Sequence, residues 1–251
     1  MTRRWIVILA SILLVSCSMR AFAQTTLSVL ALYSTKTERD HVDFAEQAVK
    51  FYGDLAKKDN FTFKASTNWD DLNTVTPAQF QVVLWLNDLP RTEEQKAGFQ
   101  RYMEAGGAWM GFHAAGYNDR STHWPWFVDF LGVVFYGNNW PPLPATLIVE
   151  DRQHPATRRL PATYNAPANE WYSWSPDPRA NKDIKVLLTL SPVNYPLGLK
   201  DTITSGDVPV AWTNTKYKMV YMNMGHGDKI FTSPTQNLMF EDTLLWLGSR
   251  R

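Results

Sequence analysis

Short apolar runs alternate with amphipathic stretches over the first half of the chain. Leu27–Tyr33, Val82–Leu86 and Ala108–Phe112 are continuous hydrophobic segments of strand length. Such runs are typical of strands that are buried on both faces of a parallel sheet. Phe61–Ser66 is predicted to be a further strand of the same sheet.

Two helices are predicted between these strands. Val42–Lys57 carries apolar residues at helical spacing, and Asp40 is a candidate N-cap for this helix. Thr92 and Gln95 form a capping box for a second helix, which is expected to end before Gly106. The alternation of strands and helices predicts an α/β protein with a mostly parallel sheet and helices on both faces.

The second half of the chain is less regular. Trp124–Phe130 is predicted to be a short helix, Asn138–Pro144 is too rich in proline for regular structure, and Asp151–Asn181 has no clear periodicity. Further elements are predicted at Ala145–Glu150, Ile184–Leu190, Val208–Thr213 and Lys218–Met224 as strands, and from Ser233 to Gly248 as a helix. Neither a repeat nor a linker divides residues 24–251, so we expect a single domain.

The first 23 residues have the pattern of a secretory signal. Two arginines precede the apolar segment Trp5–Val15, which is too short to span a bilayer. Cleavage after Ala23 would remove residues 1–23. Alternatively, a lipobox-like sequence would make residues 1–16 the leader and Cys17 a lipidated N-terminus. The sequence therefore predicts export to the periplasm or the cell envelope, with membrane contact only through that possible anchor.

Composition excludes several classes of protein. Cys17 is the only cysteine, so either cleavage leaves a folded domain without disulfides, a thiolate nucleophile or cysteine metal ligands. The 25 basic and 24 acidic residues are nearly balanced, which argues against a nucleic-acid partner. The 11 Trp, 10 Tyr and 13 Phe fit either an aromatic core or a carbohydrate site, and composition does not separate the two.

Polar residues stand where the predicted strands end. Asn87 follows the third strand, His113 the fourth and His226 the last, and His41 begins the helix that opens on the same edge. Ligands of open α/β sheets bind at the carboxyl ends of the strands. One histidine in such a turn is usually structural, whereas two that converge favour a function. Glu170 adds a carboxylate in an aromatic segment.

Four ordered segments resemble the ThuA-like, or trehalose-utilisation, family. They are GGAWMGFHAAG (Gly106–Gly116), RQHP…LP (Arg152–Pro161), NEWY (Asn169–Tyr172) and VYMNMGHG (Val220–Gly227). The resemblance extends from about Leu27 to Leu247. It implies the three-layer, flavodoxin-like fold of class I glutamine amidotransferases and a role in carbohydrate metabolism, in particular with glycosides oxidised to keto-sugars. Members commonly have Asp-Glu where this chain has Asn169-Glu170; if both acids are needed, the change weakens the site.

The amidotransferases themselves use different residues. They carry cysteine in the turn where this chain has His113, and a His-x-Glu pair in a place like that of His226-Gly227-Asp228. Without a mature cysteine, glutamine hydrolysis through a thioester is excluded. We therefore do not expect a glutamine amidotransferase.

Two mechanisms suit this set of residues. His113 and His226 could act as general base and acid, with Glu170 assisting, to isomerise a keto-sugar or eliminate its glycosidic bond. The enediolate oxygen would be stabilised by Asn87, backbone N–H groups or a metal. In the second mechanism, the two histidines and Glu170 bind Zn²⁺, Mn²⁺ or Fe²⁺. No close histidine spacing signals a metal, so acid–base chemistry is preferred.

A small carbohydrate is the expected ligand. If the irregular middle region folds over the strand ends, its aromatic residues would form the wall of a sugar pocket. The residues predicted to bind substrate are Asn87, His123, Trp124, Trp126, Trp140, Trp171 and Tyr172. Two alternatives remain open at this point: a non-catalytic sugar-binding protein on a decayed amidotransferase fold, and a metal-dependent hydrolase.

Overall fold

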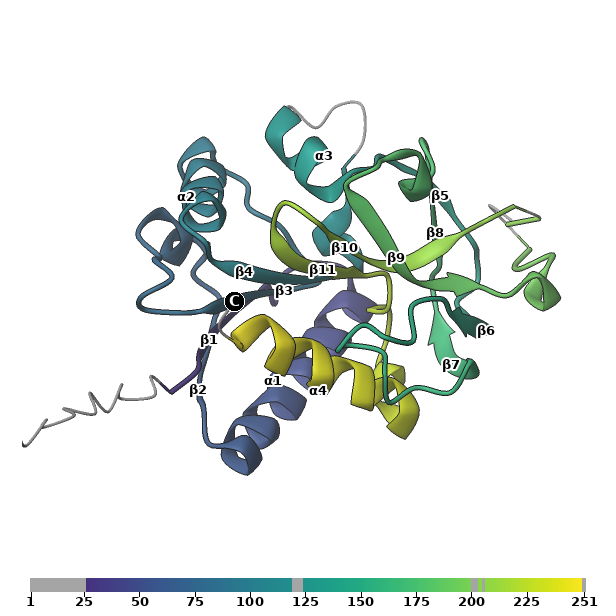
Figure 1. Ribbon diagram of the computed structural model, residues 1–251, viewed down its shortest axis with the longest axis horizontal. Coiled ribbons are helices and arrows are strands. Elements are labelled where there is room, and N and C mark those ends of the chain that lie inside the picture. The colour runs from purple at the N-terminus through teal and green to yellow at the C-terminus, as the bar shows by residue number, and fades with distance from the viewer. Residues whose placement is uncertain (1–25, 119–123, 200–202, 205, 250–251) are drawn as a thin grey trace, which may run out of the picture.

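A computed structural model describes residues 26–118, 124–199, 203–204 and 206–249. Within them, a mixed sheet of nine strands lies between two layers of helices (Figure 1). Its parallel half consists of β1 (Ser28–Tyr33), β2 (Thr62–Ser66), β3 (Val82–Leu86), β4 (Ala108–Phe112) and β11 (Lys218–Met222). The antiparallel half adds β6 (Leu143–Val149), β7 (Thr163–Asn169), β9 (Ile184–Leu190) and β10 (Pro209–Asn214).

The strand order is β2-β1-β3-β4-β11-β10-β9-β6-β7. β2, β1, β3, β4 and β11 pair in parallel, and each later pair is antiparallel. β5 (Phe135–Asn138) and β8 (Tyr172–Trp174) form a separate antiparallel pair beside this sheet. The three-layer α/β fold predicted from the sequence is confirmed.

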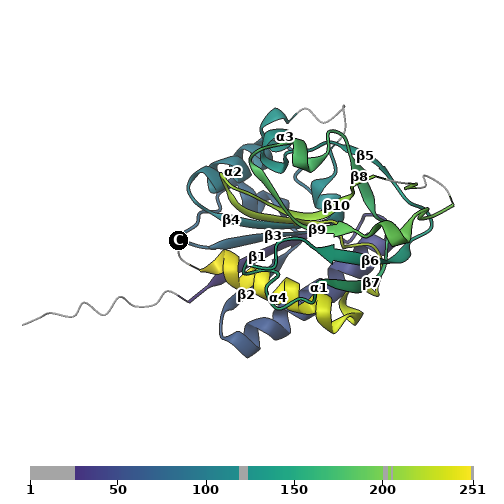
Figure 2. The same cartoon turned by 45° about the vertical axis from the view of Figure 1, so that its right-hand side comes forward.

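Each face of the sheet is covered by two helices (Figures 1 and 2). They are α1 (Arg39–Asp59) and α4 (Pro234–Gly248) on one face, and α2 (Glu93–Glu104) and α3 (Pro125–Leu131) on the other. In β1, Val29 and Ala31 join the core under α1 and α4, while Leu30 and Leu32 join the core under α2 and α3. Burial on both faces therefore explains why this strand is apolar at each of its four buried positions.

The start of α2 was predicted correctly from the sequence, whereas the predicted N-cap of α1 was wrong. The capping box of Thr92 and Gln95 is present at the start of α2. Asp40 does not cap α1, because the helix already begins at Arg39 and Glu38 occupies the N-cap position. This earlier start places Glu38 and His41 at the edge of the sheet where β1 ends.

Two segments that the sequence pattern left irregular contain strands. β7 and β8 lie within Asp151–Asn181, and β6 begins at Leu143, inside the proline-rich Asn138–Pro144. The helices of the described residues include none that is long and apolar enough to cross a membrane. The predicted leader, with Cys17, and His123 lie outside the described residues.

Candidate functional site

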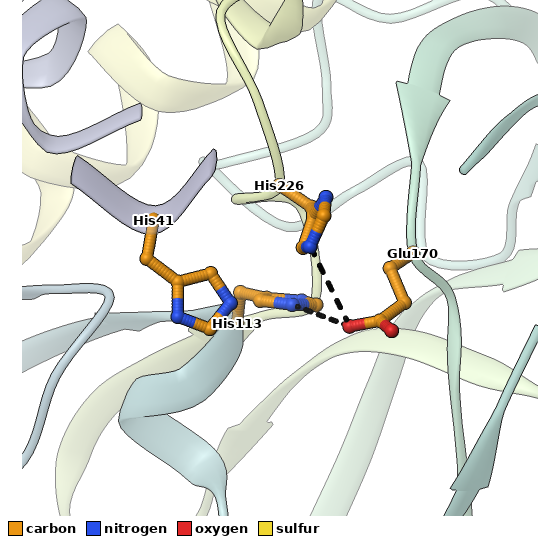
Figure 3. A group of neighbouring side chains, drawn as sticks. All are labelled: His41, His113, Glu170 and His226. Carbon is orange, nitrogen blue, oxygen red and sulfur yellow. Dashed lines mark ion pairs between the residues drawn. The ribbon is translucent and has the colours of Figure 1, made fainter. Parts of the chain in front are cut away.

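Three imidazoles and one carboxylate meet at the carboxyl edge of the sheet (Figure 3). His113 follows β4, His226 follows β11, and His41 stands in the first turn of α1. Glu170 follows β7, which four successive antiparallel pairings make parallel to β11, so its carboxyl end reaches the same edge. One nitrogen or oxygen of each residue lies within 4.8 Å of those of the other three.

The backbone of His113 adopts an unusual conformation. Its φ angle is 47°, in the left-handed region that side-chain-bearing residues rarely occupy. A Cβ added to Gly225 would lie 2.4 Å from the Cβ of His113, so only glycine fits in the facing turn. The turn after β4 thus resembles a nucleophile elbow, in which a strained strand-to-helix turn presents one side chain.

The imidazole of His113 is fully buried and neutral. Its Nδ1 lies 2.9 Å from the backbone carbonyl oxygen of Asn223, which can only accept, and 3.3 Å from the side-chain amide nitrogen of the same residue; the shorter contact favours the tautomer with the proton on Nδ1 and the lone pair on Nε2. Burial, followed by the charge of His226, lowers the pKa of His113 well below its usual value. Nε2 faces the carboxylate of Glu170 at 3.3 Å, and Nε2 of His226 lies 3.9 Å from the same oxygen.

His226 is surrounded by further carboxylates. Its side chain is 1% exposed, with Nε2 3.5 Å from Oε1 of Glu38 and Nδ1 3.4 Å from Oδ2 of Asp40. Asp228, which stands in the place of the amidotransferase glutamate, instead forms an exposed ion pair of 2.9 Å with Lys229. The acidic neighbours of His226 therefore come from the start of α1 and not from its own turn.

His41 completes the group, although the sequence interpretation placed it only at the edge and not in the site. Its ring centroid lies 5.3 Å from those of both His113 and His226, with the rings steeply inclined. Burial, and then the repulsion that would arise if His41 and His113 were both protonated, lowers the pKa of His41 to about 4, so this imidazole is also neutral at pH 7. The sequence feature that could have placed His41 in the site is its position in the first helical turn after a buried strand.

Asn169 holds the turn that carries His226. Its side-chain oxygen accepts hydrogen bonds from the backbone N–H groups of Gly225 and His226, both at 3.0 Å, and its amide nitrogen donates to the carbonyl of Glu170 at 2.9 Å. An aspartate could accept these bonds but could not donate the third. Asn169 is fully buried, so it positions the turn and does not act as a second acid.

Asn87 also connects two turns of the site. Its side-chain oxygen accepts from the backbone N–H of Ala114 at 3.0 Å, and its amide nitrogen donates to the carbonyl of Gly225 at 2.5 Å. The amide is thus engaged in holding the turns after β4 and β11 together. We assign Asn87 a positioning role in place of the predicted stabilisation of an enediolate.

A cavity of about 590 Å³ opens beside the four residues. Its lining includes Glu38, His41, Asn87, Tyr117, Glu170 and Tyr172. His113 and His226 do not line it and stand behind its wall. A cavity of this size suits a small ligand such as a sugar.

Two predicted aromatic residues lie at the site, and three do not. The ring of Tyr172 packs on His113 with centroids 4.1 Å apart, and Trp140, which is 42% exposed, lies 6.4 Å from His226 by the same measure. Trp171 is fully buried in the core, while Trp124 and Trp126 stack on phenylalanines of α3. The prediction of a sugar-pocket wall is wrong for these three, because their rings complete the hydrophobic packing.

The fold is that of glutamine amidotransferase-like proteins. The glutaminase domain of CTPS from Trypanosoma brucei shares this fold with a TM-score of 0.53, at 7% identity over 88% of this chain and 93% of that one. The chain itself belongs to the ThuA family, described as trehalose utilisation, which matches residues 29–247. This membership supports a role in carbohydrate metabolism generally.

Two solved structures of ThuA-like proteins are similar over nearly the whole chain. The protein from Bacteroides uniformis is 47% identical, with 90% of this chain and 93% of that chain covered and a TM-score of 0.85. The protein from Parabacteroides merdae is 17% identical, with 89% and 90% covered and a TM-score of 0.66. No curated protein matches the chain.

Proposed function

We propose that the protein is an enzyme that removes a proton from the carbon next to the carbonyl group of a keto-sugar. The observation that carries this proposal is the meeting of carboxylates and neutral imidazoles at the wall of a cavity of about 590 Å³. The position of this cavity at the carboxyl edge of the sheet and the carbohydrate role of the family both support it.

Glu38 is the side chain best placed to accept the proton. It lines the cavity and is 55% exposed, and its two carboxylate oxygens lie 3.5 Å from His226 and 3.6 Å from His41. A general base must reach the proton that it removes. His113 and His226, the acid and base predicted from the sequence, are buried behind the wall, so this role passes to Glu38.

The reaction proceeds through an enediolate. The proton moves to Glu38, the electron pair of the broken C–H bond forms a carbon–carbon double bond, and the carbonyl π pair moves to the oxygen. For isomerisation, the hydroxyl proton of the neighbouring carbon moves to the former carbonyl oxygen, a carbonyl forms at that neighbouring carbon, and Glu38 returns its proton to the former carbonyl carbon. Alternatively, the carbonyl re-forms, the double bond moves to the anomeric carbon, and the glycosidic oxygen leaves and takes up a proton.

The enediolate oxygen needs a positive partner. Preorganised charge at such an oxygen is commonly the largest contribution to catalysis. The cluster beside the cavity does not supply it through His41 and His113, because burial keeps both imidazoles neutral. Glu170 adds a carboxylate to the same place.

Export is part of the proposal. It is supported by the signal pattern of residues 1–23, or by the lipobox-like sequence that would make Cys17 the N-terminus. The reaction would then take place in the periplasm or at the cell envelope.

The proposal is tested by comparing a 3-keto-glycoside with its parent glycoside as substrates of the purified protein. We expect consumption of the keto-glycoside alone, because only the keto group makes the neighbouring C–H bond acidic. Chromatography of the reaction mixture measures both. If the protein binds the keto-glycoside and consumes neither compound, the non-catalytic sugar-binding alternative holds and the proposal is wrong.

A further inference from the structure

We infer that His41, His113, His226 and Glu170 bind one divalent transition-metal ion at the wall of the cavity. The ion would provide the positive charge that the enediolate oxygen requires, and this catalytic part of the inference rests on the proposed function. The binding itself does not depend on any reaction.

The separations of the side-chain atoms fit a shared ion. Metal bonds of about 2.1 Å to imidazole nitrogen or carboxylate oxygen hold two ligand atoms no more than about 4.2 Å apart. Oε2 of Glu170 lies 3.3 Å from Nε2 of His113 and 3.9 Å from Nε2 of His226. The widest separation in the group is at most 4.8 Å, so side-chain shifts of a few tenths of an ångström complete the site.

The Nε2 atom of each of the three histidines lies within 3.6 Å of a carboxylate oxygen but makes no hydrogen bond to it. Nε2 of His41, His113 and His226 is in each case inaccessible and has no hydrogen-bond partner among the described residues. In the favoured tautomer of His113 this atom has the lone pair, because Nδ1 carries the proton. A lone pair that faces a carboxylate at 3.3 Å is unfavourable unless a proton or a metal ion lies between them, and a metal ion would also satisfy the Nε2 atoms of His41 and His226.

The groups around the four residues support them as ligands. Metal-binding histidines commonly donate their second nitrogen to a carbonyl or carboxylate. Nδ1 of His113 is hydrogen-bonded to the carbonyl of Asn223, and Nδ1 of His226 lies 3.4 Å from a carboxylate oxygen of Asp40. The second oxygen of Glu170 accepts a hydrogen bond of 2.6 Å from the side chain of Asn138, which fixes its orientation.

The ligand types and the exposure define the kind of site. Three imidazoles with one carboxylate suit Zn²⁺, Mn²⁺ or Fe²⁺, whereas Mg²⁺ and Ca²⁺ prefer sites made of oxygen. His41 and Glu170 line the cavity, so an ion between the four residues would have an open side toward a bound sugar. Catalytic zinc sites usually have three protein ligands and an open fourth position, so a sugar bound at this four-ligand site would be a fifth ligand of the ion.

The inference is tested by titrating the chelator-treated protein with Zn²⁺ in the absence of sugar and measuring the heat of binding by calorimetry. We expect one Zn²⁺ per chain, and no comparable binding of Mg²⁺. His113→Ala and Glu170→Gln should each weaken the binding by more than about 10²-fold, because loss of an outer partner alone typically costs 10–100-fold. His154→Ala is the matched control, since His154 packs on Trp246 and is not part of the cluster.

The outcomes separate this inference from the proposed function. Circular dichroism shows whether each variant is folded, and Glu170→Gln preserves the size of the side chain if His113→Ala does not fold. Failure of the wild-type protein to bind Zn²⁺, or unchanged binding by folded His113→Ala and Glu170→Gln, would overturn the metal site. Stoichiometric binding without keto-glycoside turnover would support the site and contradict the proposed function.

Discussion

Glu38→Gln is expected to lower the turnover of a 3-keto-glycoside by about 10²–10⁴-fold, the usual contribution of a general base. Glu38 is the carboxylate that lines the cavity at the start of α1, with its oxygens close to both His41 and His226. The amide keeps the size of the side chain but cannot accept the proton from carbon. Steady-state kinetics should therefore show the loss mainly in kcat.

Glu46→Gln provides the control for this substitution. Glu46 is an exposed residue of the same helix and does not line the cavity, so the same chemical change should leave turnover within about twofold of wild type. Zn²⁺ binding by Glu38→Gln should weaken by no more than about 10²-fold, because Glu38 contacts His41 and His226 but is not one of the four inferred ligands. Turnover by Glu38→Gln at the wild-type rate would show that another group removes the proton.

Trp171→Ala is expected to lower the free energy of unfolding by about 3–5 kcal/mol, as for other large-to-small changes in a core. The side chain of Trp171 is fully buried, and its ring N–H donates a hydrogen bond of 2.9 Å to the carbonyl of Leu143 in β6. Its removal leaves a cavity and takes away that partner. Urea unfolding followed by circular dichroism measures the loss.

Trp140→Ala is the comparison for Trp171→Ala. Trp140 is 42% exposed and lies beside His226, so its replacement should cost no more than about 1 kcal/mol of unfolding free energy. The sequence interpretation gave these two tryptophans the same role. Equal destabilisation by the two substitutions would contradict the assignment of Trp171 to the core and Trp140 to the edge of the site.

The parallel half of the sheet was predictable because its strands are buried on both faces. β1, β3 and β4 are apolar at nearly every position, and the rule that ligands bind at strand ends then pointed to His113 and His226. β7 escaped the same reasoning. It is an edge strand in which exposed polar residues alternate with buried Tyr164 and Ala166 and are followed by Pro167, and such a strand has no apolar run.

Because β7 was not predicted from the sequence, the position of Glu170 at the carboxyl edge of the sheet could not be explained from the sequence either. Its place at the carboxyl edge follows from the direction of β7, which depends on pairings between segments far apart in the chain. The exposure of each tryptophan could not be predicted either, because it also depends on contacts between segments that are far apart in the chain. Trp124 and Trp171 differ from Trp140 in what packs against them, and one sequence contains no direct record of those contacts.

The exchange of hydrogen between sugar and solvent tests the proposed proton removal most directly. The purified protein is incubated with a 3-keto-glycoside in D₂O, and proton NMR follows the signal of the carbon-bound hydrogen next to the carbonyl. We predict loss of that signal, by exchange or elimination, with the wild-type protein and about 10²–10⁴-fold more slowly with Glu38→Gln. Retention of the hydrogen at the background rate, in a protein shown to bind the sugar, would contradict the account.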